Sequence, residues 1–319
     1  MDDRRASSFE STPYGGDGWS PRLADHRQEL GTIWSGYSLS SEWQPLQAVL
    51  VHRPGAELTA SQADPGAAQM LAPVDAVKAA AEHDAMVGAY ESAGVAVHRV
   101  EPAGEASPNL MFCADLFVMT PAGAILARPA STVRAGEERW VARRLADLGV
   151  PIVQTFTGTA TFEGADLMWL DESTAIVGRG PRTNQAGIDQ ITAALAAVGC
   201  SAVIVDLPYG AMHLMGLLRF LDSDLAIGWP RRTPHAAVMA LRDRGVQVEF
   251  PDFADRPEDY RGVNFVTLGP RRILMPAGSG AAKAFYEKLG VECLTTPTEE
   301  LSKAAGNTGC LTGVLSRDD

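Results

Sequence analysis

A cysteine near the end of the chain has the local setting of a reactive thiol. Cys310 follows AAGNTG and precedes LTGVL, so we expect it on a glycine-flanked turn that opens the last strand. A ligand can reach a thiol on such a turn, and the thiolate is a strong nucleophile. A buried structural cysteine is the alternative, and it is the commoner fate of a lone Cys. The four cysteines show no CxxC or Cys/His spacing, so the sequence predicts no metal site and no disulfide framework.

One histidine stands where an acid/base group would be needed. His213 follows a Pro/Gly loop in PYGAMHLMGLLRF, whereas the other five histidines fall in expected helices, strands or surface segments. From this loop it can give a proton to a leaving amine and later take one from water. A hydrogen-bonded structural histidine is the alternative.

Three carboxylates lie in short motifs beside alanine or glycine. FCAD supplies Asp115, and FEGAD supplies Glu163 and Asp166. Such carboxylates can hold a planar guanidinium by paired, charge-assisted hydrogen bonds, and they can orient His213. Capping or turn chemistry is the alternative for the aspartates, but a cap explains Glu163 poorly. Together with the thiol, these groups predict attack on the central carbon of a guanidinium group.

Two arginines and an asparagine are candidates for the far end of a substrate. GRGPRTNQAG carries Arg182 and Asn184 just before an expected helix, and PASTVRAGEE carries Arg134. An arginine there can bind a carboxylate through two parallel hydrogen bonds, or it can brace the turn. The sequence leaves both interpretations open.

The elements that must position these residues form a unit that recurs five times. Each unit has an amphipathic helix, a helix-stopping glycine and a short β-branched strand, at intervals of about 45 to 55 residues. The stopping glycines are Gly94, Gly149, Gly199, Gly245 and Gly290. Ahead of four of the helices stands a hairpin-like pair of strands, in DLFVMTPAGAILAR, DLMWLDESTAIVGR, LRFLDSDLAIGW and NFVTLGPRRILMP.

The two ends of this array are predicted to close it into a ring. The first unit has one clear strand, LQAVLVHRPG, before a helix at about residues 73–93, and the last strand, CLTGVL, has no hairpin mate. If these two strands pair, no sheet edge remains exposed, and equivalent ends of all units meet at one axis. The four candidate residues that fall at such ends are Asp115, Asp166, His213 and Cys310.

Composition excludes several classes of protein. The 319 residues are 46% hydrophobic and 21% charged, as in ordinary globular proteins. No apolar run is long enough to cross a membrane, and no secretory signal is present, so we expect a cytoplasmic protein. A net charge of -12 without a basic cluster argues against nucleic acid as a partner. Residues 1–40, rich in Ser, Gly, Pro and Asp, are expected to be a polar tail or a lid, and residues 41–319 a single catalytic domain.

These motifs, taken together, resemble the guanidino-group-modifying superfamily of amidinotransferases and deiminases. FCAD, FEGAD, GRGPRTN, the isolated His213 and the near-terminal Cys310 occur in the right order over residues 43–317. The chain is most similar to the branch of dimethylarginine dimethylaminohydrolases and arginine deiminases, and more distantly to glycine and inosamine amidinotransferases. The resemblance implies the pentein fold, a five-bladed pseudo-symmetric α/β propeller of ββαβ repeats. It also implies a small guanidino substrate and no metal or organic cofactor, and we expect a monomer or a homodimer.

Roles carry over only where the motifs match. The resemblance implies that Cys310 is the nucleophile, His213 the acid/base and Asp115 a guanidinium anchor. It implies that Glu163 supports the substrate or the histidine, with Asp166 in the same network. By the same similarity, Arg134 and Arg182 are candidates for a substrate carboxylate.

Three positions depart from the pattern of the superfamily. Ala114 stands where deiminases usually have Arg and dimethylarginine hydrolases an acid. Met215 stands where deiminases and amidinotransferases usually carry a second guanidinium-binding Asp, and Gly309 replaces a bulkier residue. We therefore expect a pocket that differs from a standard arginine pocket.

Three functions remain open on the sequence alone. The leading one is a hydrolase that cleaves a guanidinium through a covalent thiouronium, which water then resolves. An amidinotransferase would pass the same intermediate to an amine acceptor. A non-enzymatic binding protein on the same scaffold, like the pentein ribosome anti-association factors, would have no need of Cys310, His213 and Glu163 together.

Overall fold

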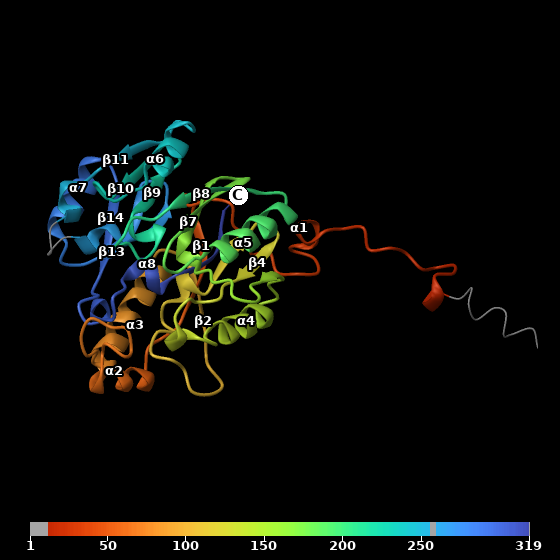
Figure 1. Cartoon of the computed structure of the whole chain (residues 1–319), viewed down its shortest axis with the longest axis horizontal. Coiled ribbons are helices and arrows are strands. Elements are labelled where there is room, and N and C mark those ends of the chain that lie inside the picture. The colour runs from red at the N-terminus through yellow and green to blue at the C-terminus, as the bar shows by residue number, and fades with distance from the viewer. Residues whose placement is uncertain (1–11, 256–259, 319) are drawn as a thin grey trace, which may run out of the picture.

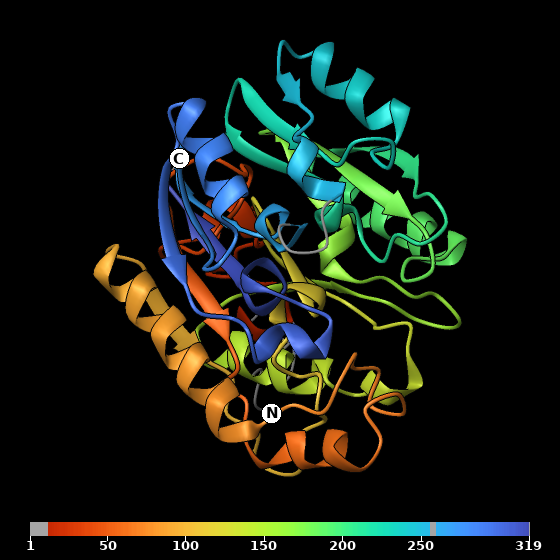
Figure 2. The same cartoon turned by 90° about the vertical axis from the view of Figure 1, so that its left-hand side faces the viewer.

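Five small sheets surround one axis in this protein. A computed structural model describes residues 12–255 and 260–318 of the chain. Its strands form five three-stranded sheets, whose ribbons are drawn in Figure 2. One central channel is lined by residues from all five of them. We call each sheet with its helix a blade and number the blades from the N-terminus. The predicted five-bladed α/β propeller is therefore confirmed.

The strands of the five blades have the following bounds. Blade one holds β15 (Gly313–Arg317), β1 (Leu46–Val51) and β2 (Ala96–Arg99). Blade two holds β3 (Phe117–Thr120), β4 (Gly123–Leu126) and β5 (Ile152–Thr155), and blade three holds β6 (Leu167–Asp171), β7 (Thr174–Arg179) and β8 (Ser201–Asp206). Blade four holds β9 (Leu218–Asp222), β10 (Leu225–Gly228) and β11 (Gln247–Glu249), and blade five holds β12 (Val266–Gly269), β13 (Arg272–Pro276) and β14 (Glu292–Thr296).

One long helix belongs to each blade, and three shorter helices lie between or outside the blades. In blade order the long helices are α3 (Ala76–Ser92), α4 (Glu138–Asp147), α5 (Gln185–Ala197), α6 (His235–Arg242) and α7 (Gly280–Lys288). The shorter ones are α1 (His26–Glu29), α2 (Thr59–Ala63) and α8 (Thr308–Leu311). Figure 1 shows α3, α4, α6 and α7 at the outside, with the strands toward the centre. Each described helix is too short or too polar to cross a membrane.

The helix of each blade returns the chain to a strand that runs parallel to the one before the helix. In blade three, for example, β6 and β7 are antiparallel, whereas β7 and β8 are parallel from Thr174 opposite Ser201 to Arg179 opposite Asp206. The five stopping glycines all have left-handed backbone, with φ between 71° and 83°. A side chain would be strained in that conformation, which is why glycine ends each helix.

The ring closes as predicted, although its last strand begins later than expected. β1 pairs antiparallel with β15, with Val49 opposite Val314 and Leu50 opposite Gly313. Cys310 does not open this strand, because residues 308–311 form α8 and β15 begins at Gly313. The Asn307 side chain accepts a hydrogen bond from the Thr308 amide and so caps α8. The thiol therefore lies on a helical turn that precedes the closing strand.

Neighbouring blades share their apolar core. One buried cluster joins Leu50 of β1 and Leu315 of β15 to Leu116 and Leu145 of blade two. Each blade is too small to bury its own apolar faces, so it is stabilised by its neighbours on both sides.

The segment before β1 packs at the end of the sheets away from Asp115. The Leu39 amide donates to the Thr120 carbonyl at the far end of β3, and the Ser35 amide donates to the Gly149 carbonyl. Residues 12–25 extend away from the blades in Figure 1. Residues 1–11 lie outside the described residues, so the part of the tail-or-lid prediction that concerns them stays a prediction, as does the boundary at residue 40.

Candidate active site

Four turns at the entrances of inner strands bring the candidate residues together. Asp115 ends a 3-10 turn before β3, Asp166 ends another before β6, His213 precedes a third before β9, and Cys310 lies in α8 before β15. The strands that follow these turns line the central channel. Their equivalent ends therefore meet at one mouth of the channel, as the repeat predicts.

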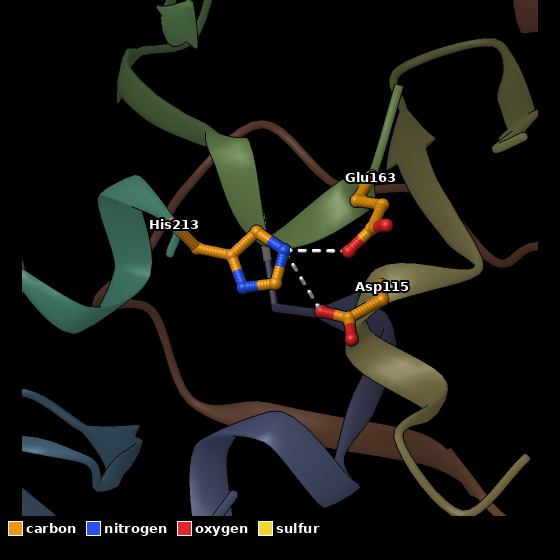
Figure 3. A group of neighbouring side chains, drawn as sticks. All are labelled: Asp115, Glu163 and His213. Atoms are coloured by element: carbon orange, nitrogen blue, oxygen red, sulfur yellow. Dashed lines mark hydrogen bonds and ion pairs between the residues drawn. The ribbon is translucent and has the colours of Figure 1, made fainter. Parts of the chain in front are cut away.

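His213 and two carboxylates form a buried cluster at this mouth. The Nε2 of His213 donates to the Oε2 of Glu163 over 2.6 Å and lies 3.9 Å from the Oδ1 of Asp115. Figure 3 shows the three side chains pointing toward one another from different elements. Burial acts to lower the pKa of His213, but the charge of Asp115 and the bond to Glu163 outweigh it and raise the pKa to about 9. His213 is therefore a proton donor at neutral pH.

Glu163 is fixed from several sides. Its side chain is 0% exposed, and its Oε1 accepts from the Ala130 amide over 3.0 Å and lies 3.4 Å from Arg182. Burial acts to raise its pKa, but the hydrogen bond from His213 and the surrounding positive charges hold the pKa below its usual range. The next residue must be glycine, because a Cβ on Gly164 would lie 2.4 Å from the carbonyl oxygens of Ala114 and Phe117.

Asp115 has one oxygen engaged and one free of hydrogen bonds. Its Oδ2 accepts from Arg134 over 2.5 Å, whereas its buried Oδ1 has no hydrogen-bond partner within the described residues. A buried acceptor without a partner is unfavourable, and a donor on a ligand would satisfy it. Arg134, by contrast, is buried and is shared between Asp115 and Glu137. Its guanidinium is thus engaged inside the protein, and a substrate carboxylate would have to compete with these acids for it.

Asp166 and Asn184 support the site from behind. Asp166 is 0% exposed, and its two oxygens accept from the Thr183 hydroxyl and from the Leu214 amide, next to His213. Burial raises the pKa of Asp166 to about 6. Asn184 caps α5 by accepting from the Gly187 amide, and its Nδ2 donates to the Thr159 carbonyl. In this structure both residues therefore brace loops.

The thiol of Cys310 is held by an amide that the sequence analysis missed. The Nδ2 of Asn264 donates to the Sγ over 3.0 Å, and the Oδ1 of the same side chain accepts from the Gly309 amide over 2.8 Å. Burial and the charge of Asp115 raise the pKa of the thiol, while the bond from Asn264 acts in the opposite direction. A Cβ on Gly309 would lie 2.5 Å from the Oδ1 of Asn264, so this contact requires glycine there.

Two cavities meet at the thiol. A recess of about 30 Å³ is lined by residues that include Asp115, Arg134, Arg182, His213 and Cys310. A groove of about 410 Å³ opens on its other side and shares His213 and Cys310 with the recess. The cysteine, the histidine and the acids are therefore accessible from one place, with positive and negative groups arranged for a planar polar ligand.

Comparisons with known proteins agree on one family. The family model described as eukaryotic N,N dimethylarginine dimethylhydrolase matches residues 68–207. N(G),N(G)-dimethylarginine dimethylaminohydrolase of Streptomyces coelicolor is 30% identical over 238 residues, which are 75% of this chain and 86% of the relative. The enzyme of the same name from Pseudomonas aeruginosa is 26% identical over 239 residues, 74% of this chain and 88% of the relative.

The chain belongs to the dimethylarginine dimethylaminohydrolase family.

Solved structures place this family within the pentein fold. A dimethylarginine dimethylaminohydrolase bound to 4-chloro-2-hydroxymethylpyridine superimposes with a TM-score of 0.70 at 22% identity, over 84% of this chain and 99% of that one. SxtG, an amidinotransferase of the saxitoxin pathway from Microseira wollei, gives a TM-score of 0.71 at 17% identity, over 89% and 98% of the two chains. At these identities both likenesses show the fold alone. As a member of the family, the chain is a cysteine-dependent hydrolase of guanidino compounds.

The departures from the superfamily pattern have visible consequences in this family member. Ala114 is buried and lines the central channel on the far side of its turn, so it adds no charge to the recess. Met215 lines both the channel and the groove, where an aspartate would have brought a negative charge. The charge of the site therefore rests on Asp115, Glu163 and the arginines beside them.

A metal ion is the other ligand that this acidic cluster could hold. Asp115, Glu163 and His213 each offer an atom, and these atoms lie within 4.8 Å of one another. However, Arg134 lies against Asp115, Arg182 lies against Glu163, and the raised pKa of His213 keeps its ring protonated. A divalent cation would face these positive charges, so the arrangement favours a hydrogen-bonding ligand over a metal ion.

Proposed function

We propose that this chain hydrolyses a carbon–nitrogen bond of a guanidinium-bearing small molecule, with Cys310 as nucleophile and His213 as acid/base. The observation that carries the proposal is the meeting of a thiol, a protonated histidine and the unpartnered Oδ1 of Asp115 in one recess. A guanidinium carries N–H donors in one plane, and the carboxylate of Asp115 is the acceptor that lines the recess, while the buried Glu163 is bonded to His213. The relatives are named for dimethylarginine, whose guanidine carries substituents on nitrogen, and an N-substituted guanidine is the proposed substrate class.

The first half of the reaction forms a covalent intermediate. The thiolate of Cys310 adds to the guanidinium carbon and forms a carbon–sulfur bond. The bond from that carbon to one nitrogen then breaks, and the nitrogen leaves as an amine with the proton given by His213. The enzyme is left as an S-alkylthiouronium, with neutral His213 still bonded to Glu163.

The second half regenerates the enzyme. His213 takes a proton from water, and the hydroxide oxygen adds to the thiouronium carbon. The carbon–sulfur bond then breaks as the added hydroxyl loses its proton to solvent, which releases a urea and the thiolate. The Asn264 amide donates to the sulfur in the structure and so stabilises the thiolate each time it forms. Glu163 keeps the ring of His213 oriented toward the reacting carbon throughout.

The experiment that tests this proposal compares two cysteine variants. Cys310→Ser is expected to abolish amine release from guanidines and to remove the covalent adduct seen by mass spectrometry with 2-chloroacetamidine, a guanidine-like electrophile. Cys293→Ser is the matched control, because Cys293 is also partly buried but its pKa is raised to about 11 by burial at a strand. Full activity of Cys310→Ser would contradict the proposal.

The same assay separates hydrolysis from amidino transfer. Amine and urea are expected to appear in water without any added acceptor. Turnover that occurs only when a primary amine is supplied, with the amidino group found on that amine, would assign the chain to the amidinotransferases instead.

A further inference from the structure

The room for a substrate at Cys310 lies on one side only. The recess that holds Asp115 measures about 30 Å³ and is by far the smaller of the two cavities, so it suits the small planar end of a ligand. The groove measures about 410 Å³ and joins the recess along a shared border. The residues that line both cavities are Met212, His213, Ala305, Gly306 and Cys310. A guanidinium seated against the thiol would therefore extend its larger substituent into the groove.

Larger apolar side chains line much of this groove, six of them from blades four and five and one, Leu71, from the segment before α3. They are Leu71, Met212, Met215, Leu217, Trp229, Tyr260 and Val263. Leu217 and Val263 are buried, whereas 44% of Met212 is exposed. The indole N–H of Trp229 donates to Asp255, so its one polar atom is already engaged. The ring of Trp229 therefore offers the groove an apolar surface.

The charges at the groove are positive. Arg232 and Arg261 both line it, and the guanidinium carbon of Arg232 lies 4.7 Å from the centre of the Trp229 ring. Among the described residues that line the groove there is no aspartate or glutamate. Among these described lining residues, the ammonium group of a free amino acid would find no carboxylate partner and would face two arginines. An arginine-like substrate is thus poorly matched to this wall.

We propose that the groove is a substrate subsite that binds an apolar alkyl or aryl substituent on the guanidine. This inference rests on the proposed function, since it assigns the guanidinium to the recess and the rest of the molecule to the groove. It names a substrate class in which a cationic amidine end is joined directly to a hydrocarbon body, and it explains why the wall toward blades four and five has aromatic and sulfur-containing side chains.

A series of n-alkylguanidines from methyl to hexyl tests the subsite in the full-length enzyme. Loss of the guanidine is followed by mass spectrometry, so that cleavage of either carbon–nitrogen bond is counted. We expect kcat/KM to rise about threefold to fourfold with each methylene while the chain fills the groove, from the usual gain on burying a CH₂ group. We also expect hexylguanidine to be preferred over arginine and methylated arginines. A flat or falling series, or a preference for the amino acids, would overturn the subsite.

Two variants connect the chain-length gain to the groove. In Trp229→Ala and in Met212→Ala, the rise in kcat/KM with each added methylene is expected to fall to about twofold or less, because part of the apolar wall is removed. Met239→Ala is the matched control, since Met239 is 39% exposed on α6 and does not line the groove. Equal gains in all three variants would show that the groove does not hold the chain.

Covalent labelling of Cys310 tests the subsite without depending on turnover. N-alkyl-2-chloroacetamidines of rising chain length are expected to alkylate Cys310 increasingly fast, and the dependence should again weaken in Trp229→Ala. If no member labels Cys310, the proposed function fails and the subsite fails with it. If all members label Cys310 at one rate, the proposed function stands and only the subsite is refuted.

Discussion

The pair formed by His213 and Glu163 gives the site its acid, and Glu163→Gln is the change that tests this. Glutamine keeps the size of the side chain and an oxygen toward His213, but it removes the negative charge. The Oε2 of Glu163 lies 2.6 Å from the Nε2 of His213 in a fully buried position. We therefore expect the pKa of His213 to fall when the charge is removed.

The size of this fall follows from the interaction that is lost. A hydrogen bond to a charged group contributes about 1.5 to 3 kcal/mol, and one pKa unit corresponds to about 1.4 kcal/mol. The pKa of His213 should thus fall by about one to two units from its value of about 9. Asp115 at 3.9 Å and the nearby Asp166 remain, so the positive form keeps part of its stabilisation.

The measurement is an NMR titration of the histidine rings in the Cys310→Ser background, where the neighbouring thiol no longer titrates. The signal of His213 is identified by its absence in His213→Gln. Glu57→Gln is the matched control, because Glu57 forms another His–Glu pair in the described residues, a partly buried one with His52 at 3.2 Å. A pKa of His213 that is unchanged or higher in Glu163→Gln would refute the reasoning. An equally large fall of the His213 pKa in Glu57→Gln would refute it as well.

Two further predictions concern the supports of the site. In Asn264→Ala, the pKa of Cys310 should rise because the donor to its sulfur is lost. Alkylation of the thiol by iodoacetamide at pH 7 should therefore slow by about tenfold to a hundredfold. The capping variant Asn184→Ala is the control and should leave this rate unchanged. In Asp166→Asn, the pH dependence of stability should change, because the pKa of Asp166 is raised in the folded state from 3.8 to about 6. Its contribution is full below pH 4 and is lost as the pH rises through 6, so the wild type should lose about 3 kcal/mol relative to the variant over this range in urea unfolding. An equal pH dependence of the two proteins would contradict this.

The repeat could be predicted because each unit carries its own local signals. A left-handed glycine follows each of the five long helices, and a short strand comes after it. The spacing of these glycines, which are Gly94, Gly149, Gly199, Gly245 and Gly290, therefore indicates five blades directly. The start of β15 was missed for a local reason as well. CLTGVL has the composition of a strand, but Asn307 caps a helical turn that includes Cys310. The cap from Asn307, three residues before Cys310, makes this segment helical where its composition predicts a strand.

The site could be predicted in part, because the same ends of successive units carry its residues. Asp115, Asp166 and His213 precede the inner strands of blades two, three and four, and Asn264 holds the corresponding place in blade five. The pattern could have indicated Asn264, but this residue begins NFVTLGPRRILMP, which the sequence predicts to be a pair of strands from its first residue. The ion pairs of Arg134 with Asp115 and Glu137 could not be predicted from the sequence, because they depend on which side chains share a buried space.

These ion pairs also bear on how a substrate can be bound at all. Asp115, which lines the recess, and the buried Glu163 are already matched by Arg134, Arg182 and protonated His213, so an incoming guanidinium meets no excess of negative charge there. Its hydrogen bonds can orient it at the thiol, but charge attraction alone contributes little to affinity when the partners are already paired. Interactions with remote parts of a substrate are what hold a reacting group in place against such competition. In this chain the only large space beside Cys310 within the described residues is the apolar groove. We therefore expect the groove to supply most of the affinity for a substrate, and the recess on the other side of the thiol to orient its guanidinium.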